Sequence, residues 1–318
     1  MLNWFVTFVF LTVFSLPLQA AEQQMTVAGL SGTLLMPDNL KTGSVLPVVL
    51  IVAGSGPVNR DGNISHIHNN SLKFLAEGLA DTGIASLRYD KRGIGQSRSE
   101  TINESDMRFS GNVDDALSWY DLLQKDDRFS KIIFAGHSEG ALVVTLAAQQ
   151  REKLPTKLKG VVLLTGAGTP AGELLRKQLL KAGLPEGLRT EASEALDRLE
   201  QGKRVEPVSK ELNAVFRQSV QNYLISWFAI DPAKELARLT LPVLIVSGGQ
   251  DLQVEAVEAT KLARSVQQGQ LLHIEAMNHI LKPAHGDRAK NIASYSQPDM
   301  PLTPELLPAI AAFIAAQN

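Results

Sequence analysis

The chain has 318 residues, and 44% of them are hydrophobic, which is enough to bury a large core as one sizeable domain or as a domain with an insertion. The formal net charge is −2 and the charges are evenly spread, which argues against nucleic acid or an anionic membrane surface as a partner. Because the chain contains no cysteine, disulfides, thiolate nucleophiles and cysteine-ligated metals are excluded.

The N-terminal segment differs from the rest, because residues 4–16 are almost continuously hydrophobic and residues 1–20 carry no charged side chain. A run of about thirteen residues is short for a transmembrane helix but fits the apolar region of a secretory signal peptide. Pro17 ends the run, and Ala20 is small enough for a signal-peptidase site. We therefore expect a signal peptide at 1–20, cleavage near Ala20/Ala21, and a periplasmic or secreted protein without a membrane anchor. An uncleaved hydrophobic helix is the alternative.

Short β-rich runs and helical runs alternate after this segment. Apolar runs or hairpin patterns predict strands at 24–27, 32–36, 46–53, 84–89, 132–135, 160–164, 242–247 and 271–274. Helical spacing of apolar residues predicts helices between them, for example over 72–79 and 113–123. This alternation predicts an α/β fold with a mainly parallel sheet of about eight strands flanked by helices.

The alternation stops at 169–233, where the sequence contains helical stretches but no buried strand. These stretches are 173–180, 192–199 and 212–228. We interpret 169–233 as a helical cap inserted after the sixth strand, so that 21–168 and 234–318 together form the core domain. A series of ordinary crossover helices is the alternative interpretation.

The pentapeptide Gly136-His137-Ser138-Glu139-Gly140 joins the strand-like run 131–135 to the helical run 141–148. In a G-x-S-x-G nucleophile elbow, a sharp strand-to-helix turn holds the serine strained and exposed, and the glycines let strand and helix pack closely. The pentapeptide alone is a weak signal, but it stands where this chemistry requires it. Ser138 is therefore the candidate nucleophile.

A serine hydroxyl needs a base to take its proton and a third group to orient that base. After an elbow serine, the acid and then the histidine are expected just beyond later strands. Asp251 and His279 occur in this order, each directly beyond a predicted strand, and are the candidate acid and base. For Asp251 the alternative is a turn or helix-capping role. His273, within a strand, and His285, in a loop, compete with His279.

The oxyanion of an acyl-transfer intermediate needs two backbone N–H donors aimed at it. Glu139, which follows the nucleophile at the start of a helix, is the first candidate donor. The loop after the strand 46–53 supplies the second, with Ser55 as first choice and Gly56 as second, because Pro57 has no N–H. The glycine spacing in this loop does not fit a phosphate-binding motif.

With these pieces, the chain resembles the α/β-hydrolase superfamily over nearly all of its mature length. It is most similar to bacterial serine hydrolases described as esterases or as S33-type serine aminopeptidases. The segments 54–63, 70–73 and 87–97, the elbow, and Met277-Asn278-His279 carry the resemblance. One departure is the first loop, where Ala53-Gly54 stands in place of the His-Gly pair common in the superfamily.

A serine nucleophile indicates acyl transfer rather than the alkyl-enzyme chemistry of hydrolases with a carboxylate nucleophile. We therefore expect an exported serine hydrolase that cleaves small to medium apolar carboxylic esters without a cofactor or a metal. The aromatic residues Tyr223, Trp227 and Phe228 are candidates for an apolar acyl pocket or, equally, for the core of the cap. His66 and His68 come nearest to a metal-binding pair, and we interpret them as part of a polar loop near the pocket mouth.

Two other functions stay open. A serine aminopeptidase or amidase would act on the N-terminal residues of short peptides and would need a carboxylate for the substrate ammonium, for which Glu139 and Glu173 are candidates. A hydrolase-fold protein that binds a small ligand without turnover is the third reading.

Overall fold

The computed structural model describes residues 22–38, 40–153 and 156–317, so the expected signal peptide at 1–20 lies outside the described residues. The strands are β1 (Glu22–Val27), β2 (Leu30–Leu35), β3 (Leu46–Val52), β4 (Ala85–Tyr89), β5 (Phe129–His137), β6 (Leu158–Leu164), β7 (Val243–Gly248) and β8 (Gly269–Ile274). The α-helices are α1 (Ser71–Asp81), α2 (Phe109–Gln124), α3 (Glu139–Arg151), α4 (Ala171–Lys181), α5 (Glu186–Glu200), α6 (Asn213–Phe216), α7 (Gln221–Phe228), α8 (Pro232–Leu236), α9 (Ala256–Ser265), α10 (Arg288–Ser294) and α11 (Leu306–Ala315). Three short 3-10 turns are η1 (Gly95–Ser97), η2 (Glu104–Asp106) and η3 (Gln218–Val220).

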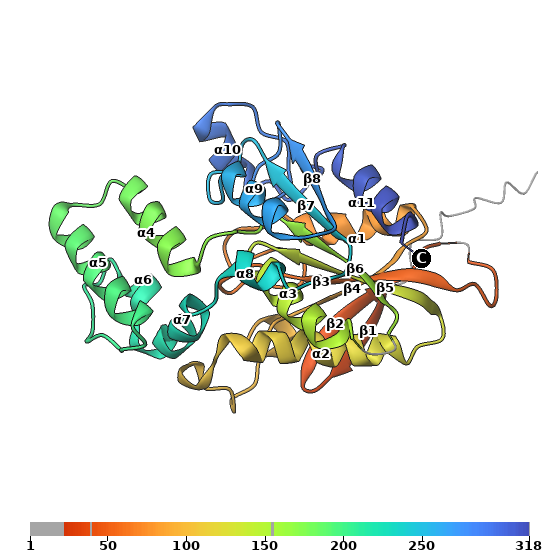
Figure 1. Cartoon of the computed structure of the whole chain (residues 1–318), viewed down its shortest axis with the longest axis horizontal. Helices are drawn as coiled ribbons and strands as arrows, with labels where there is room; N and C mark the ends of the chain where they lie inside the picture. The colour runs from red at the N-terminus through yellow and green to blue at the C-terminus, as the bar shows by residue number, and fades with distance from the viewer. Residues whose placement is uncertain (1–21, 39, 154–155, 318) are drawn as a thin grey trace, which may run out of the picture.

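The strands of the described residues form one sheet in the order β1-β2-β4-β3-β5-β6-β7-β8 (Figure 1). The pairs β1–β2 and β2–β4 are antiparallel, and all pairs from β4 to β8 are parallel. The inner strands have continuous apolar sequences, such as that of β3, because each is covered on both faces. The mainly parallel, helix-flanked sheet predicted from the sequence is confirmed.

Helices cover both faces of the sheet (Figure 1). On one face, α1 and α11 contribute side chains such as Leu75 and Ile310 to a hydrophobic cluster. On the other face, Trp119 of α2, Val144 of α3 and Leu262 of α9 belong to a second cluster. Each of these side chains is buried, which stabilises the fold by about 1.5–3 kcal/mol per large apolar side chain. Within the described ranges, no helix has both the length and the apolar character that a membrane span needs.

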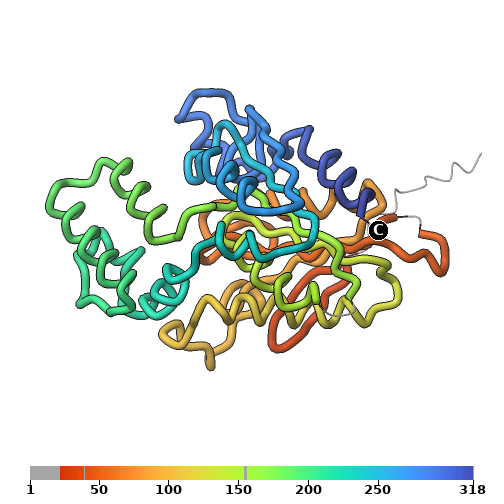
Figure 2. The backbone as a smooth tube through the Cα atoms, viewed as in Figure 1, coloured from red at the N-terminus to blue at the C-terminus, as the bar shows by residue number. Residues whose placement is uncertain are grey.

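Between β6 and β7 the chain leaves the sheet and forms a group of helices at its side (Figure 2). We call residues 169–233 the cap; its main helices are α4, α5, α6 and α7. These helices share a hydrophobic cluster of their own, in which Leu196, Leu199 and Phe216 are buried. The short helix α8 instead packs against the core, where Leu236 joins the cluster of α2 and α3.

The prediction of one helical stretch over 212–228 is wrong. Arg217 has an extended backbone (φ −51°, ψ 146°), so α6 ends at Phe216 and α7 begins only after the turn η3. The Gln221 side chain donates a hydrogen bond to the Phe216 carbonyl at 2.9 Å across this break. The Arg217 side chain forms an ion pair with Glu104 of the core. Tertiary contacts therefore override the local helical pattern.

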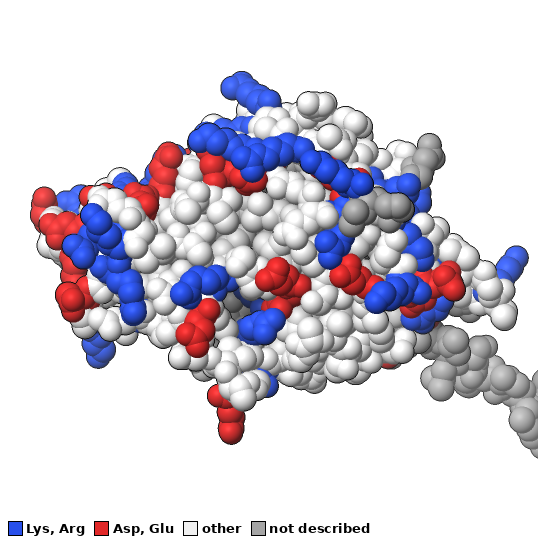
Figure 3. Space-filling model, turned by 60° about the horizontal axis from the view of Figure 1, so that its bottom comes forward, with Lys and Arg blue, Asp and Glu red and all other residues white. Residues whose placement is uncertain are grey.

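Besides the Arg217–Glu104 ion pair, hydrogen bonds of both α7 and α4 attach the cap to the core. At α7, the Ser226 hydroxyl accepts a hydrogen bond from the Phe109 N–H at 2.8 Å. At α4, the Gln178 side chain donates to the Gln253 carbonyl at 2.9 Å. Charged side chains of both signs occur across the face of the molecule in Figure 3, as the near-neutral net charge predicts.

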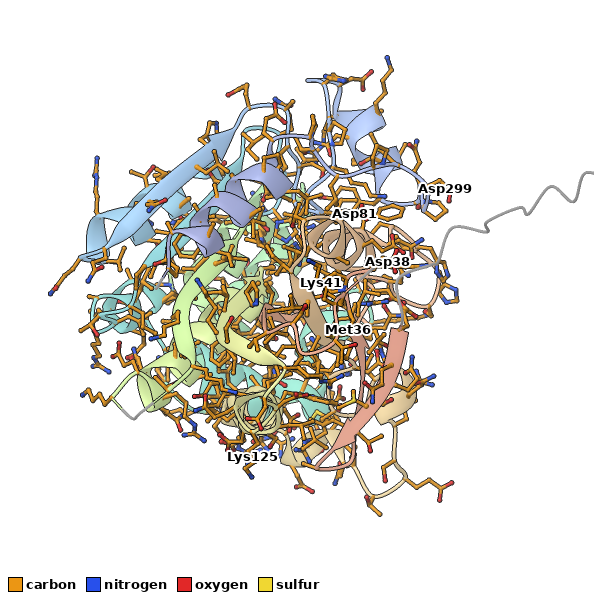
Figure 4. All side chains as sticks on the ribbon, turned by 90° about the vertical axis from the view of Figure 1, so that its right-hand side faces the viewer. Met36, Asp38, Lys41, Asp81, Lys125 and Asp299 are labelled. Carbon is orange, nitrogen blue, oxygen red and sulfur yellow. The ribbon has the colours of Figure 1, made fainter. Side chains whose placement is uncertain are left out.

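The end of the molecule opposite the cap is the amino edge of the parallel strands. Figure 4 views this end and labels Asp38 and Lys41 before β3, Asp81 before β4, and Lys125 before β5. The carboxyl edge of the sheet therefore lies toward the cap, and open α/β sheets bind their ligands at this edge.

We predict that Gly136→Ala lowers the free energy of unfolding by more than about 3 kcal/mol, because a Cβ at this position would lie 2.1 Å from the carbonyl oxygen of Gly140. Urea unfolding followed by circular dichroism measures the change. The control is Gly187→Ala in the exposed first turn of α5, where a Cβ meets nothing within 4 Å. That change is expected to be neutral or to stabilise by up to about 1 kcal/mol. Equal stabilities of the two variants would contradict the prediction.

Candidate active site

Four loops at the carboxyl edge of the sheet carry the residues that the sequence singles out. They follow β3, β5, β7 and β8 and contain, in that order, the segment 53–57, Ser138, Asp251 and His279. Parallel strands end at the same edge, so these residues come together although more than two hundred positions separate the first loop from the last.

Ser138 occupies the sharp turn between β5 and α3, with φ 54° and ψ −118°. A left-handed φ costs a residue with a side chain about 1–3 kcal/mol, so the surroundings must impose it. The Ser138 N–H donates to the Leu164 carbonyl at 2.8 Å, and the Ala141 N–H donates to the Ser138 carbonyl at 3.0 Å. A Cβ on Gly140 would lie 2.4 Å from the Val52 carbonyl oxygen, so only glycine permits this approach. The turn has the geometry predicted for a nucleophile elbow.

Asp251 and His279 are in direct contact. Asp251 Oδ2 accepts a hydrogen bond from His279 Nδ1 at 2.8 Å, and both side chains are buried. Asp251 Oδ1 accepts from the N–H groups of Gln253 and Val254 at 2.7 and 2.9 Å, so the turn role expected as an alternative is present as well. The carboxylate thus holds the imidazole proton on Nδ1 and leaves Nε2 as an acceptor. No hydrogen bond joins His279 to Ser138 among the described residues; such bonds are often long without substrate.

The loops that carry Asp251 and His279 are joined by backbone hydrogen bonds. The Gly249 N–H donates to the Ile274 carbonyl at 3.0 Å, and the Gln250 N–H donates to the Met277 carbonyl at 2.9 Å. A Cβ on Gly248 would lie 2.1 Å from the Met277 carbonyl oxygen, so the two backbones approach as closely as glycine allows. This packing sets the separation between Asp251 and His279, the candidate acid and base.

Two asparagines, Asn278 and Asn291, support these loops through hydrogen bonds. The Asn278 side-chain oxygen accepts from the N–H groups of Ile280 and Lys282 at 3.2 and 3.1 Å, which closes the turn around His279. The Asn278 amide donates to Asn291 of α10 at 3.1 Å, and Asn291 donates to the Gln250 carbonyl at 2.6 Å. One chain of hydrogen bonds therefore supports both loops.

His137 connects the elbow with the His279 loop. Its Nε2 lies 2.7 Å from the His279 carbonyl oxygen, and the two ring centroids are 5.0 Å apart. Because a carbonyl oxygen only accepts, His137 carries a proton on Nε2. Burial, together with the neighbouring His279, lowers the pKa of His137 from 6.5 to about 4, so the ring is neutral near pH 7.

The candidate oxyanion donors lie next to the elbow. Glu139 is the first residue of α3, so its N–H has no acceptor within the helix. The loop after β3 passes beside Ser138, since a Cβ on Gly54 would lie 3.1 Å from the Ser138 Cβ. Neither the Ser55 N–H nor the Gly56 N–H donates a hydrogen bond to any other described residue. None of these three amides therefore has an acceptor among the described residues, and two of the residues, Gly56 and Glu139, line a neighbouring cavity.

A cavity of about 870 Å³ opens beside the elbow, between the core and the cap. Core and cap residues both line it, among them Pro57, Ile94, Ile102, Met107, Glu139, Ala214, Val220 and Tyr223. Six lining residues have apolar side chains, and seven are charged: Lys91, Arg92, Arg98, Glu100, Glu104, Glu139 and Arg217. A cavity of this size fits a small-molecule substrate, and it lies beside Ser138, Asp251 and His279, which do not line it themselves.

Two of the charged residues that line the cavity, Lys91 and Glu139, lie close together. Lys91 Nζ donates hydrogen bonds to the carbonyl oxygens of Gly54 and Gly56, the latter at 2.9 Å, and lies 3.9 Å from Glu139 Oε1. The Tyr223 hydroxyl lies next to the same carboxylate. Burial raises the pKa of Glu139 and lowers the pKa of Lys91, and the charge of each partner opposes the other's shift.

The three cap aromatics have different places. Tyr223 lines the cavity. Trp227 stacks on Phe109 of the core with ring centroids 5.9 Å apart, and Phe228 is buried in the cluster of the cap. Of the two places expected for these aromatic residues, Tyr223 therefore lies at the pocket and Phe228 lies in the core of the cap.

The competing histidines lie elsewhere. His66, His68 and His285 are exposed in loops. His273 lies on β8, where its Nδ1 is 2.9 Å from the Ser247 hydroxyl. Among the residues that the structure describes, no group of three or more His, Cys, Asp or Glu side chains is placed to hold a metal ion.

Sequence reasoning did not identify Lys91, His137, Asn278 or Asn291 as parts of the site. The first three lie within segments that carry the family resemblance, so a charged or polar residue inside a motif was an available signal. Asn291 lies on α10, twelve positions after His279, and no local pattern marks it.

Solved structures of other proteins share this fold. Est1E from Butyrivibrio proteoclasticus, solved with ferulic acid bound, is 21% identical with a TM-score of 0.57, over 86% of this chain and 96% of that one. Proline iminopeptidase from Mycobacterium smegmatis is 15% identical with a TM-score of 0.57, over 93% of this chain and 98% of that one. The fold is therefore the α/β-hydrolase fold.

Sequence comparison places the chain within that fold. Esterase EstD from Thermotoga maritima is 29% identical over 268 residues, which are 83% of this chain, and the chain spans 61% of the length of EstD. The family model of the serine aminopeptidases, S33, matches residues 62–282. This segment contains the elbow, the cap, Asp251 and His279. The chain therefore belongs to the S33 serine aminopeptidase family of α/β-hydrolases.

Proposed function

We propose that this protein is a serine hydrolase that cleaves carboxylic esters through an acyl-enzyme. The observation that carries the proposal is the buried 2.8 Å hydrogen bond between Asp251 and His279, on loops adjoining the strained Ser138 elbow. An oriented base, a half-buried serine nucleophile and backbone N–H donors without another acceptor are the parts that acyl transfer needs. The names of esterase EstD and Est1E support an ester as the substrate.

In the acylation step, Ser138 Oγ attacks the ester carbonyl carbon while His279 Nε2 takes the hydroxyl proton. The carbonyl oxygen becomes an oxyanion and accepts hydrogen bonds from the N–H of Glu139 and from that of Ser55, with Gly56 as the second choice. The C–O bond to the alcohol then breaks, and the His279 imidazolium returns its proton to the leaving oxygen. Asp251 stays ionised and stabilises the imidazolium.

Deacylation uses the same groups in reverse. His279 takes a proton from a water molecule, and the resulting hydroxide equivalent attacks the acyl carbon bound to Ser138. The second oxyanion forms at the same two donors, and the proton on His279 passes to Ser138 Oγ as the carboxylic acid leaves. Each step moves one proton between His279 and an oxygen atom, so the cycle needs no cofactor.

The pairing of the two carboxylates expected to hold a substrate ammonium supports an ester with an apolar acyl or alcohol group over a peptide with a free N-terminus. Binding of a substrate ammonium would need a carboxylate without a partner, and neither carboxylate that the sequence indicates for this role is one. Glu139 already faces Lys91 and Tyr223. Glu173 is exposed and pairs with Lys177 at 2.8 Å. Glu100, which also lines the cavity, is exposed and forms no ion pair among the described residues, so it is the remaining candidate for the aminopeptidase alternative. The cap, which contributes part of the cavity lining, is expected to set the length of the group that fits.

We predict hydrolysis of p-nitrophenyl esters, with a preference for short to medium acyl chains, and much slower release of p-nitroaniline from aminoacyl anilides. A fluorophosphonate probe should label Ser138, and Ser138→Ala should lower kcat for esters by at least about 10⁴-fold while the melting temperature changes little. Steady-state kinetics and mass spectrometry of the labelled peptide measure these outcomes. Faster turnover of the anilides would support the aminopeptidase instead, and a folded protein that neither turns over nor labels would support a binding protein.

A second prediction concerns the acid. Asp251→Asn should lower kcat by about 10³–10⁴-fold, because an amide no longer stabilises the imidazolium or holds the Nδ1–H tautomer. The matched control is Asp197→Asn, at an exposed position of the cap, and it should leave kcat unchanged. Full activity of Asp251→Asn would show that another residue orients His279.

The third prediction is a pH dependence that originates at His137. The pKa of His137 is about 4 in the folded protein and near 6.5 in the unfolded chain, so between these values the unfolded chain binds the proton more tightly. His137 therefore contributes stability above pH 6.5 that is lost as the pH falls toward 4, by about 3 kcal/mol in total.

His137→Gln removes this titration while an amide N–H can still donate to the His279 carbonyl. We expect the free energy of unfolding of this variant to fall less between pH 7 and pH 4.5 than that of the wild type, as measured by urea unfolding at both pH values. His285→Gln, at an exposed loop position, serves as the control and should follow the wild type. Equal acid losses in all three proteins would contradict the assignment.

A further inference from the structure

We propose that Lys91 is a positioning residue of the oxyanion hole: it orients the Ser55 N–H by holding the carbonyl groups of the loop after β3. The proposal deepens the proposed function and rests on it. Lys91 follows β4 by two residues, so a strand other than those that carry Ser138, Asp251 and His279 supplies this support.

The hydrogen bonds of Lys91 fix the shape of the loop. The side chain is 9% exposed, and its ammonium donates to the carbonyl oxygens of both Gly54 and Gly56. Ala53, Gly54 and Gly56 have no polar side-chain atom that could anchor the loop themselves. Gly56 has a φ of 75°, a conformation that a glycine adopts without strain but does not enforce. The Lys91 ammonium therefore fixes a loop conformation that the residues of the loop do not enforce by themselves.

The geometry of the peptide group then aims the Ser55 N–H. The peptide bonds of the described residues are trans, and in a trans peptide the carbonyl of one residue and the N–H of the next point in opposite directions. With the Gly54 carbonyl held by Lys91, the Ser55 N–H points away from Lys91. The Gly56 carbonyl lies in the peptide bond with Pro57, whose nitrogen carries no hydrogen. Holding this carbonyl therefore does not fix the direction of any N–H donor.

The loop so oriented lies against the nucleophile. A Cβ on Gly54 would lie 3.1 Å from the Cβ of Ser138, so the Gly54–Ser55 peptide is beside the reacting group. Lys91 is also 3.9 Å from the carboxylate of Glu139, whose backbone N–H is the other candidate donor. One buried ammonium thus holds the Gly54–Ser55 peptide and lies beside the side chain of the residue that carries the first donor, and this favours Ser55 over Gly56 as the second donor.

The test compares wild type with Lys91→Met, which keeps a long side chain but removes all three N–H donors. For p-nitrophenyl esters we expect kcat to fall by about 10- to 100-fold, less than the loss of about 10²–10³ for deleting a donor outright, with KM changed by no more than about threefold. The inhibition constant of an alkyl trifluoromethyl ketone should rise by the same factor as kcat falls. Its adduct with Ser138 carries the oxyanion, whereas the substrate ground state does not.

Two further variants serve as references. Lys234→Met, at a lysine whose side chain is 79% exposed, should match the wild type in kcat and KM. Lys91→Gln keeps an N–H donor that can reach one carbonyl at most, and we expect its kcat to lie between those of wild type and Lys91→Met. If Lys91→Met does not fold, the same measurements on Lys91→Gln decide.

The outcomes distinguish a failure of the proposed role of Lys91 from a failure of the proposed ester hydrolysis. An unchanged kcat in a folded variant overturns the role of Lys91, and so does a higher KM at constant kcat, which would make Lys91 a substrate-binding residue. A wild type without ester hydrolysis or probe labelling refutes the proposed function. Crystal structures still test the positioning in that case: we expect the Gly54–Ser55 peptide to rotate in Lys91→Met, and an unchanged peptide overturns the proposal.

Discussion

The close approach of β5 and α3 is the constraint on which the site depends. A side chain at Gly136 would overlap the backbone of Gly140, and one at Gly140 would overlap the backbone of Val52, so strand and helix meet with no room for a gradual turn. The chain changes direction within one residue, and this forces Ser138 to φ 54°. The neighbouring loops are then placed relative to this turn, the β3 loop through Gly54 and the β8 loop through His137.

Burial makes the surrounding polar groups rigid. A polar or charged group removed from water is stable only when its hydrogen-bonding capacity is met inside the protein. Asp251, His279, His137 and Lys91 are all less than a tenth exposed, and each has partners that hold it in one orientation. Preorganised polar groups of this kind need no rearrangement as charge develops on a substrate, which is why enzymes gain most from them in a site that excludes water.

The sequence was most informative where local pattern and tertiary structure agree. Continuous apolar runs such as that of Leu46–Val52 predicted the inner strands, since only a strand covered on both faces has such a composition. The order of Ser138, Asp251 and His279 predicted that they would share one edge of the sheet, because connectivity fixes which strand ends are neighbours.

The sequence was least informative where a contact joins distant segments. The break at Arg217 follows from an ion pair with Glu104, 113 positions earlier, and no helical pattern contains that information. Lys91 donates to carbonyl groups 35 and 37 positions before it. Because every residue has a backbone carbonyl, no sequence pattern can mark these two as its partners. Whether a carboxylate beside the cavity has a partner, as Glu139 has in Lys91, is likewise visible only in the folded chain.

The hydrophobic cluster within the cap has a consequence for how this protein can evolve. Leu196, Leu199 and Phe216 pack mainly with other cap residues, whereas the sheet is stabilised by its own two clusters. Mutations of cap residues that line the cavity and pack against this cluster alone, such as Val220, therefore affect the stability of the cap and leave the two clusters of the core domain unchanged. Evolution can therefore vary the cap, and with it the molecules that fit the cavity, without changing the residues at the strand ends.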